Sequence, residues 1–228
     1  LPEGCAEVLL HALEDRSSSV RLLGARGLGR LKHPSAGSPL LDVVRAAKPT
    51  VLVGVSGVPG LFDEEIVRTM AAQIERPGVF PLSNPTSKSE ARPPDVMAWT
   101  DGRALMATGS PFEPVEIAGQ TIRIGQGNNA FVFPGVGLGV LVSEAREVTD
   151  GMFAAAADAL AAQLPEEDLR AGSLFPRIAG LRAITARVAE AVVRQAESEG
   201  VARSVPEDPA AAVAAAMWDP AYPAIDVA

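Results

Sequence analysis

The sequence is poor in the residues that build disulfide frameworks and zinc centres. Its 228 residues include one cysteine and two histidines. A single cysteine cannot form an internal disulfide, and this usage is typical of a reducing compartment, so we expect a cytoplasmic protein. So few thiol and imidazole groups also argue against a structural zinc site. We therefore expect no metal ligands in the chain.

Basic residues are also scarce relative to acidic ones. The chain has 20 Lys and Arg against 28 Asp and Glu, a formal net charge of −8, and its pI is about 4.9. Nucleic acids and anionic membranes attract basic surfaces, so we expect neither as a partner. No apolar run approaches the roughly 20 residues of a membrane helix. The first residues lack the basic segment and apolar core of a secretory signal.

Short apolar strands alternate with amphipathic helices through the first half of the chain. This order predicts an α/β fold with a doubly wound, mainly parallel sheet. The expected strands are 20–23, 49–57, 78–84 and 104–110, and the expected helices are 5–14, 39–48, 58–73 and 92–100. The near-continuous apolar run at 49–57 is typical of a strand covered on both faces. A β-hairpin over 115–125 and helices over 133–149, 150–164 and 179–200 follow.

Three of the expected strands end in short loops of small and polar residues. The loops are Gly54-Val55-Ser56-Gly57, Ser83-Asn84-Pro85 and Thr108-Gly109-Ser110. In open parallel sheets, ligands bind outside the carboxyl ends of the strands. If these strands are neighbours, the three loops converge on one crevice, where the Asn84 amide can meet a ligand.

Long segments of the sequence resemble the C-terminal half of malic enzymes. They include KPTVLVGVSGVPGLFDEEIV, RPGVFPLSNPTSKSEARPPDV, WTDGRALMATGSPFEPVE and IGQGNNAFVFPGVGLGVL, and the resemblance runs from around residue 20 to around residue 205. It implies a Rossmann-like domain that binds NAD or NADP. It also implies that the two loop asparagines, Asn84 and Asn129, contact the substrate or the nicotinamide. The cofactor-binding residues that it implies are Val55, Ser56, Gly57, Ser83, Asn84 and Asn129.

The sequence departs from the family pattern where catalysis and phosphate binding are expected. The family's Tyr/Lys acid–base pair and Glu/Asp/Asp metal site precede this half and are absent here, so no catalytic residue is assigned. The family's GxGxxG turn is replaced by LPEGCAE, in which Gly4 is the sole glycine and Glu3 and Glu7 oppose a diphosphate. Gly24 stands where an Asp normally meets the ribose. We therefore expect a fold incomplete at its N-terminal βα unit, a degenerate active site and weak cofactor affinity.

Several of these residues also have ordinary structural interpretations. Asn84 and Asn129 suit turn or helix caps, although the resemblance favours ligand contact. The loop at 54–60 is either a tight turn or a backbone anion nest. Lys88 and Glu90 are typical of a solvated loop pair, with Lys88 as the basic group best placed to meet a carboxylate or phosphate.

We place the domain boundaries at residues 164 and 205. Residues 1–164 are expected to form the Rossmann-like domain, 165–205 a helical extension and 206–228 a Pro- and Ala-rich tail. The loss of a first strand leaves a sheet edge or an apolar face uncovered, and exposed edges promote association. We therefore expect a homo-oligomer, or a partner that supplies the missing half.

Three functions remain open on the sequence. The first is the nucleotide-binding half of a malic enzyme, which acts in oxidative decarboxylation of malate to pyruvate when joined to its missing half. The second is a repurposed relative that performs a cofactor-independent reaction on a small carbonyl or carboxylate substrate in a biosynthetic pathway. The third is a non-catalytic binding partner.

Overall fold

A computed structural model describes residues 37–219 of the chain, which form two compact units. The first unit contains residues 37–128 together with Pro165–Pro176, and the second contains Asn129–Leu164 and residues 177–219. The units thus divide the chain at other positions than the boundaries drawn from the sequence. The elements expected at 5–14 and 20–23 lie outside the described residues.

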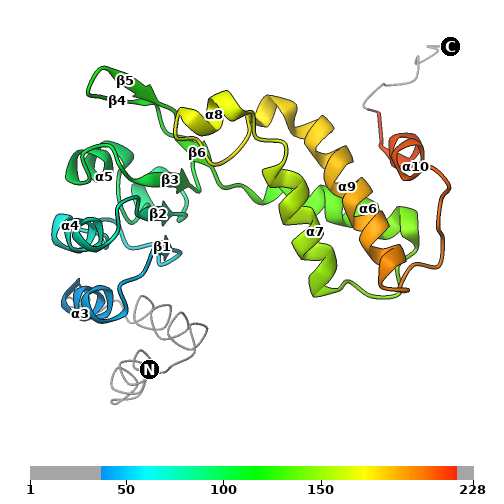
Figure 1. The fold of residues 1–228 in the computed structure, drawn as a ribbon, viewed down its shortest axis with the longest axis horizontal. Helices are drawn as coiled ribbons and strands as arrows, with labels where there is room; N and C mark the ends of the chain where they lie inside the picture. The colour runs from blue at the N-terminus through cyan, green and yellow to red at the C-terminus, as the bar shows by residue number, and fades with distance from the viewer. Residues whose placement is uncertain (1–36, 220–228) are drawn as a thin grey trace, which may run out of the picture. The chain divides into compact units, whose positions relative to one another are not determined.

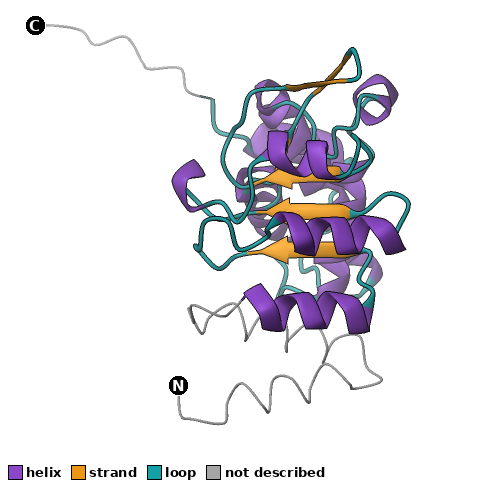
Figure 2. Cartoon of the chain, turned by 90° about the vertical axis from the view of Figure 1, so that its left-hand side faces the viewer, coloured by secondary structure: helices purple, strands orange, loops and turns teal. Residues whose placement is uncertain are grey.

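The first unit is built on a parallel sheet, as the sequence predicted. Figure 2 shows its strands side by side, and their order is β1-β2-β3-β6. The strands are β1 (Val51–Gly54), β2 (Gly78–Pro81), β3 (Leu105–Thr108) and β6 (Gly125–Gln126), and the helices between them are α4 (Glu64–Gln73) and α5 (Pro93–Trp99), with α3 (Gly37–Ala47) before β1. The α/β alternation is therefore confirmed. Helices α4 and α5 are shorter than expected, whereas α3 begins and ends earlier than the expected range 39–48.

The hydrophobic core lies between this sheet and its helices. Helices α3, α4 and α5 lie along one side of the strands (Figure 1). Leu52 pairs with Val79, and Val79 pairs with Met106, so these three side chains share one face of the sheet. They are buried together with residues of the three helices, such as Val44 and Ile66. Each fully buried aliphatic side chain contributes about 1.5–3 kcal/mol relative to exposure.

Strand β1 differs from the expectation of a strand covered on both faces. Val51 and Val53 are 46% and 38% exposed, whereas Leu52 between them is buried. Successive side chains of a strand point to opposite faces, and the described helices cover only the face that carries Leu52. Within residues 37–219, β1 is also the edge of the sheet.

Local sequence signals explain where the elements begin and turn. Helix α4 starts at Glu64, later than expected, because the Asp63 side chain accepts a hydrogen bond from the Ile66 backbone N–H at 2.9 Å and caps the helix. The predicted hairpin is present as β4 (Val115–Ile117) and β5 (Gln120–Ile122). Its two turn residues, Ala118 and Gly119, both have positive φ values, as a tight two-residue hairpin turn requires.

The second unit is a helical assembly around α9 (Leu181–Ser198). Helices α6 (Phe133–Ser143), α7 (Asp150–Ala161) and α10 (Pro209–Ala216) each pack against α9. Helix α6 ends before the expected residue 149 because Glu144 adopts a left-handed conformation (φ 47°). Helix α10 was not predicted, and its Asp208 N-cap accepts a hydrogen bond from the Ala211 N–H at 3.1 Å.

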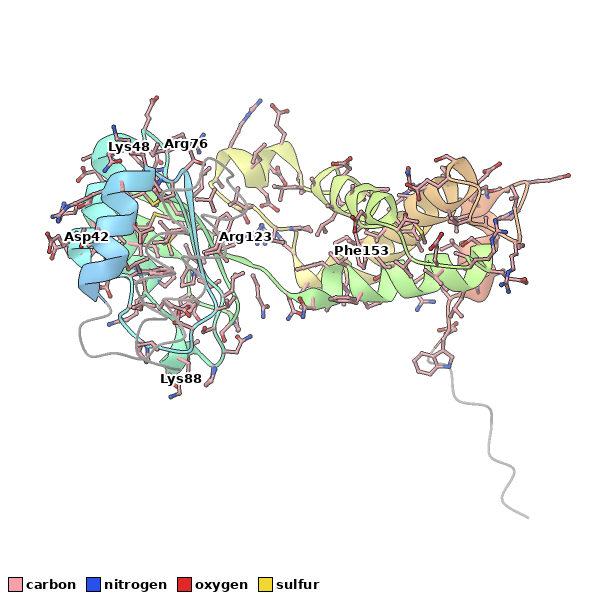
Figure 3. All side chains as sticks on the ribbon, turned by 90° about the horizontal axis from the view of Figure 1, so that it is seen from below. Asp42, Lys48, Arg76, Lys88, Arg123 and Phe153 are labelled. Atoms are coloured by element: carbon pink, nitrogen blue, oxygen red, sulfur yellow. The ribbon has the colours of Figure 1, made fainter. Side chains whose placement is uncertain are left out.

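No helix within the described range 37–219 has the length and apolar character needed to cross a membrane. The remaining short elements are η1 (Thr86–Lys88), η2 (Asn129–Phe131), η3 (Ile178–Gly180) and α8 (Glu166–Arg170), and α8 belongs to the first unit. Arg123, which precedes β6, pairs with Asp168 of α8 at 3.1 Å (Arg123 is labelled in Figure 3). This ion pair joins the two sequence segments of the first unit.

Candidate ligand-binding site

The three loops singled out in the sequence do meet at one edge of the first unit. Strands β1, β2 and β3 are adjacent and parallel, so their carboxyl ends lie side by side. Hydrogen bonds continue past the strands, from the Leu82 N–H to the Gly54 carbonyl at 2.8 Å and from the Gly109 N–H to the Pro81 carbonyl at 3.3 Å. The expected convergence is therefore present in the structure.

Asn84 stands on this edge with one side of its amide held and the other side available. The hydroxyl of Ser110, from the loop after β3, donates a hydrogen bond to Asn84 Oδ1. Within the described residues the Asn84 Nδ2 group has no hydrogen bond, and the side chain is exposed. The peptide bond between Asn84 and Pro85 is cis. What the site offers at Asn84 is thus a hydrogen-bond donor, suited to a carboxamide or carboxylate oxygen.

The loops after β1 and β2 bind a fully buried carboxylate, which the sequence interpretation placed in solvent. Glu90 has no exposed surface. Its Oε1 accepts hydrogen bonds from the Ser56 N–H at 2.7 Å, the Ser56 hydroxyl at 2.8 Å, the Gly57 N–H at 3.2 Å and the Ser83 hydroxyl at 2.5 Å. The solvated-pair interpretation is wrong for Glu90, while Lys88 is exposed as expected (Figure 3).

These contacts change the role available to the Val55-Ser56-Gly57 loop. The backbone N–H groups of Ser56 and Gly57 already bind the Glu90 carboxylate, and the Val58 N–H donates to the Ser56 hydroxyl at 3.1 Å. The protein's own carboxylate thus occupies the position that an external anion would take in an empty nest. Val55, at 65% exposure, is the side chain that this loop presents to the surface.

Hydrogen bonding keeps Glu90 ionised. Burial raises the pKa of the Glu90 carboxyl, but the hydrogen bonds from Ser83 and Ser56 outweigh burial and bring the pKa below its usual value of 4.5. Ser83 is itself buried and donates into this network, so its side chain supports the loops from inside. The cofactor contact that the resemblance implies for Ser83 stays a prediction.

The lowered pKa predicts a specific acid sensitivity. A carboxyl whose pKa is lower in the folded state stabilises the fold fully above its unfolded-state value and loses this contribution as pH falls through the folded-state value. We expect the free energy of unfolding of the first unit to fall below pH 4.5. In Glu90→Gln this part of the pH dependence should vanish. Urea unfolding between pH 7 and pH 3 measures it, and the same slope in both proteins would contradict it.

Asn129, the second predicted ligand contact, belongs to the second unit. It is exposed and begins η2, where its carbonyl accepts a hydrogen bond from the Val132 N–H at 3.0 Å. It therefore serves as a local turn residue, and ligand contact by its side chain stays a prediction. The phosphate and ribose positions that were predicted to be degenerate, Gly4 and Gly24, lie outside the described residues.

The described residues at the carboxyl edge present both polar and apolar groups. Asn84 offers a donor, Val55 offers an apolar surface, and the N–H groups of the β1 loop are engaged internally. No group of three or more metal-ligating side chains occurs among residues 37–219.

The sequence of the chain is similar to those of a known protein family. Residues 24–197 match the family model described as "Malic enzyme, NAD binding domain". NAD-dependent malic enzyme 3 of Bacillus subtilis (strain 168) is 51% identical over 186 residues, which are 82% of this chain and 33% of that protein. The NAD-dependent malic enzyme of Shewanella sp. (strain ANA-3) is 54% identical over 162 residues, 71% of this chain and 29% of that protein.

Solved structures of malic enzymes have the same fold. The structure from Entamoeba histolytica aligns with a TM-score of 0.61 at 27% identity, covering 76% of this chain and 32% of that chain. The structure from Pyrococcus horikoshii OT3 aligns with a TM-score of 0.60 at 27% identity, covering 78% and 36%. The chain therefore spans about a third of the length of the relatives that it matches.

Proposed function

Because the chain belongs to the malic enzyme family and matches its NAD-binding domain, we propose that it supplies the nucleotide-binding part of an enzyme that oxidatively decarboxylates malate to pyruvate. The observation that carries the proposal is the exposed Asn84 donor at the junction of the β1, β2 and β3 loops. In this assignment the Asn84 amide orients a carbonyl or carboxylate oxygen at the reacting end of the cofactor. We place the activity in the cytoplasm.

We further propose that NAD is the cofactor and that this chain alone binds it weakly. The named relatives are NAD-dependent malic enzymes. When bound, NAD would accept a hydride from the substrate alcohol. The β1 loop N–H groups are engaged by Glu90, and Glu3 and Glu7 stand where the family's phosphate turn is expected. Submicromolar NAD binding by the isolated chain would contradict weak affinity, and tighter binding of NADP would contradict the choice of NAD.

The partner that we propose is a polypeptide segment equivalent to the remainder of the malic enzyme relatives. The observation that supports this proposed partner is the exposed apolar face of helix α6. Phe133 and Leu141 are 58% and 75% exposed, and a Cβ added at Gly137 between them would have no neighbouring atom within 4 Å. These residues recur every four positions and so share one face of the helix. Helix α6 has no charged residue, whereas a helix facing water normally carries a polar outer face.

Complementation tests the proposed function directly. The chain is mixed with the segment of the Bacillus subtilis relative that precedes the matched region, and NAD reduction is followed with malate and a divalent metal ion. We expect no turnover by the chain alone, because general acid–base residues contribute about 10²–10⁴-fold and the metal adds several kcal/mol. We expect malate-dependent turnover in the mixture.

A surface substitution makes this experiment specific. Leu141→Glu should abolish complementation without changing thermal unfolding of the isolated chain, because the side chain is exposed. Leu169→Glu is the matched control, since Leu169 is 51% exposed on α8 of the other unit. Equal turnover by both variants would contradict the role of α6. Self-association that only Leu141→Glu disrupts would assign the face to a second copy of the chain.

A further inference from the structure

The buried carboxylate of Glu90 has an environment that packing alone does not require. Among the described residues it forms no salt bridge, and its side chain is fully buried. An uncompensated buried charge is strongly destabilising. The compensation comes from hydrogen-bond donors, which include a fifth and longer bond from the Ser83 N–H to Oε2 at 3.4 Å.

The donors belong to the two loops that flank the candidate site. Ser56 and Gly57 follow β1, and Ser83 follows β2 and directly precedes Asn84. The Ser83 hydroxyl also accepts a hydrogen bond from the Gly57 N–H at 2.9 Å. One carboxylate therefore fixes the spacing between the loop that presents Val55 and the loop that presents Asn84.

The sequence makes room for this carboxylate at Gly54. A Cβ atom there would lie 2.6 Å from Glu90 Cδ and 2.7 Å from Oε2. The Glu90 backbone is held as well, since its carbonyl accepts a hydrogen bond from the Phe62 N–H at 3.1 Å. The absence of a side chain at Gly54 thus lets the carboxylate reach both loops.

We propose that Glu90 is a positioning residue, whose carboxylate acts as a permanent internal anion that preforms the β1 and β2 loops and reserves the Val55 surface for an uncharged part of the dinucleotide. The assignment rests on the proposed function for its ligand. Occupation of the nest excludes an external phosphate from the β1 loop. The rigid link through Ser83 holds the Asn84 amide ready to donate.

Chemical rescue separates this role from ordinary packing. The full chain is prepared as wild type, Glu90→Ala and Glu90→Gln, with Glu113→Gln as an exposed control in the same unit. Amide hydrogen exchange at Ser56 and Gly57 is measured by NMR, and NAD affinity by calorimetric titration. In Glu90→Ala we expect exchange at least about tenfold faster and NAD binding at least about tenfold weaker, because several bonds to a charged group are lost.

Acetate should restore both properties in Glu90→Ala, while sodium chloride at equal ionic strength should not. Glu90→Gln keeps the size of the side chain, so it should show smaller changes in the same direction even if Glu90→Ala fails to fold. Unchanged exchange in Glu90→Gln, or faster exchange with unchanged NAD affinity, would overturn the proposal. If wild type binds no NAD, the proposed function and the ligand part of this assignment fail together, while exchange still decides whether Glu90 holds the loops.

Discussion

Replacing Gly109 with alanine is expected to lower the free energy of unfolding of the first unit by about 3 kcal/mol or more. The added Cβ would lie 2.1 Å from the Leu82 carbonyl oxygen and 2.7 Å from its carbonyl carbon. These are backbone atoms, so no side-chain rotation relieves the clash. The β2 and β3 loops would have to separate, and urea unfolding monitored by circular dichroism measures the loss.

The matched control is Gly127→Ala. Its added Cβ would approach the same neighbour, Leu82, but at a side chain that can move. A Cβ at Gly127 would lie 3.3 Å from Cδ2 of Leu82, the end of a flexible side chain. Gly127→Ala should therefore cost no more than about 1 kcal/mol. Equal losses in the two variants would contradict the clash between a Cβ at position 109 and the Leu82 backbone as the cause of the destabilisation.

The second large effect is expected in α6, where two glycines on different faces should respond oppositely to the same change. A Cβ at Gly139 would lie 2.6 Å from Cβ of Val192 and 2.8 Å from the Ala189 carbonyl oxygen. Gly139→Ala should push α6 away from α9 and destabilise the second unit by about 2–3 kcal/mol.

Gly137→Ala should stabilise the same unit. Nothing lies within 4 Å of a Cβ at this position, and alanine is favoured over glycine inside a helix by about 0.5–1 kcal/mol. Thermal unfolding of the two variants should therefore move in opposite directions from wild type. Destabilisation by both would contradict the assignment of Gly137 to the open face of α6.

Periodicity and turn chemistry in the sequence were sufficient to predict β1, β2, β3 and most helices, but not the short strand β6. Strand–helix alternation located β1, β2 and β3, and the polar loops after them located Asn84 at the carboxyl edge of the sheet. Helix α10 was missed although Asp208-Pro209 is a standard helix start. Its Ala-rich run was assigned only to the Pro- and Ala-rich tail at 206–228.

The burial of Glu90 and its contacts with both loops could not be predicted from the sequence. A glutamate in a polar loop is solvated by default, because charged residues are rarely fully buried. Its donors lie far along the chain at Ser56 and Gly57, as well as at Ser83, and only the folded strands bring them together. The end of α6 at Glu144 was likewise unpredictable, since no glycine or proline marks it.

We propose that the carboxyl edge of β1–β3 binds NAD, and an NMR titration of the ¹⁵N-labelled chain measures this binding residue by residue. We expect saturable chemical-shift changes on addition of NAD, concentrated at the backbone amides of Val55, Ser83 and Asn84, with smaller changes on addition of NADP. No change in a sample with a folded, dispersed spectrum, or changes confined to residues away from this edge, would contradict the claim.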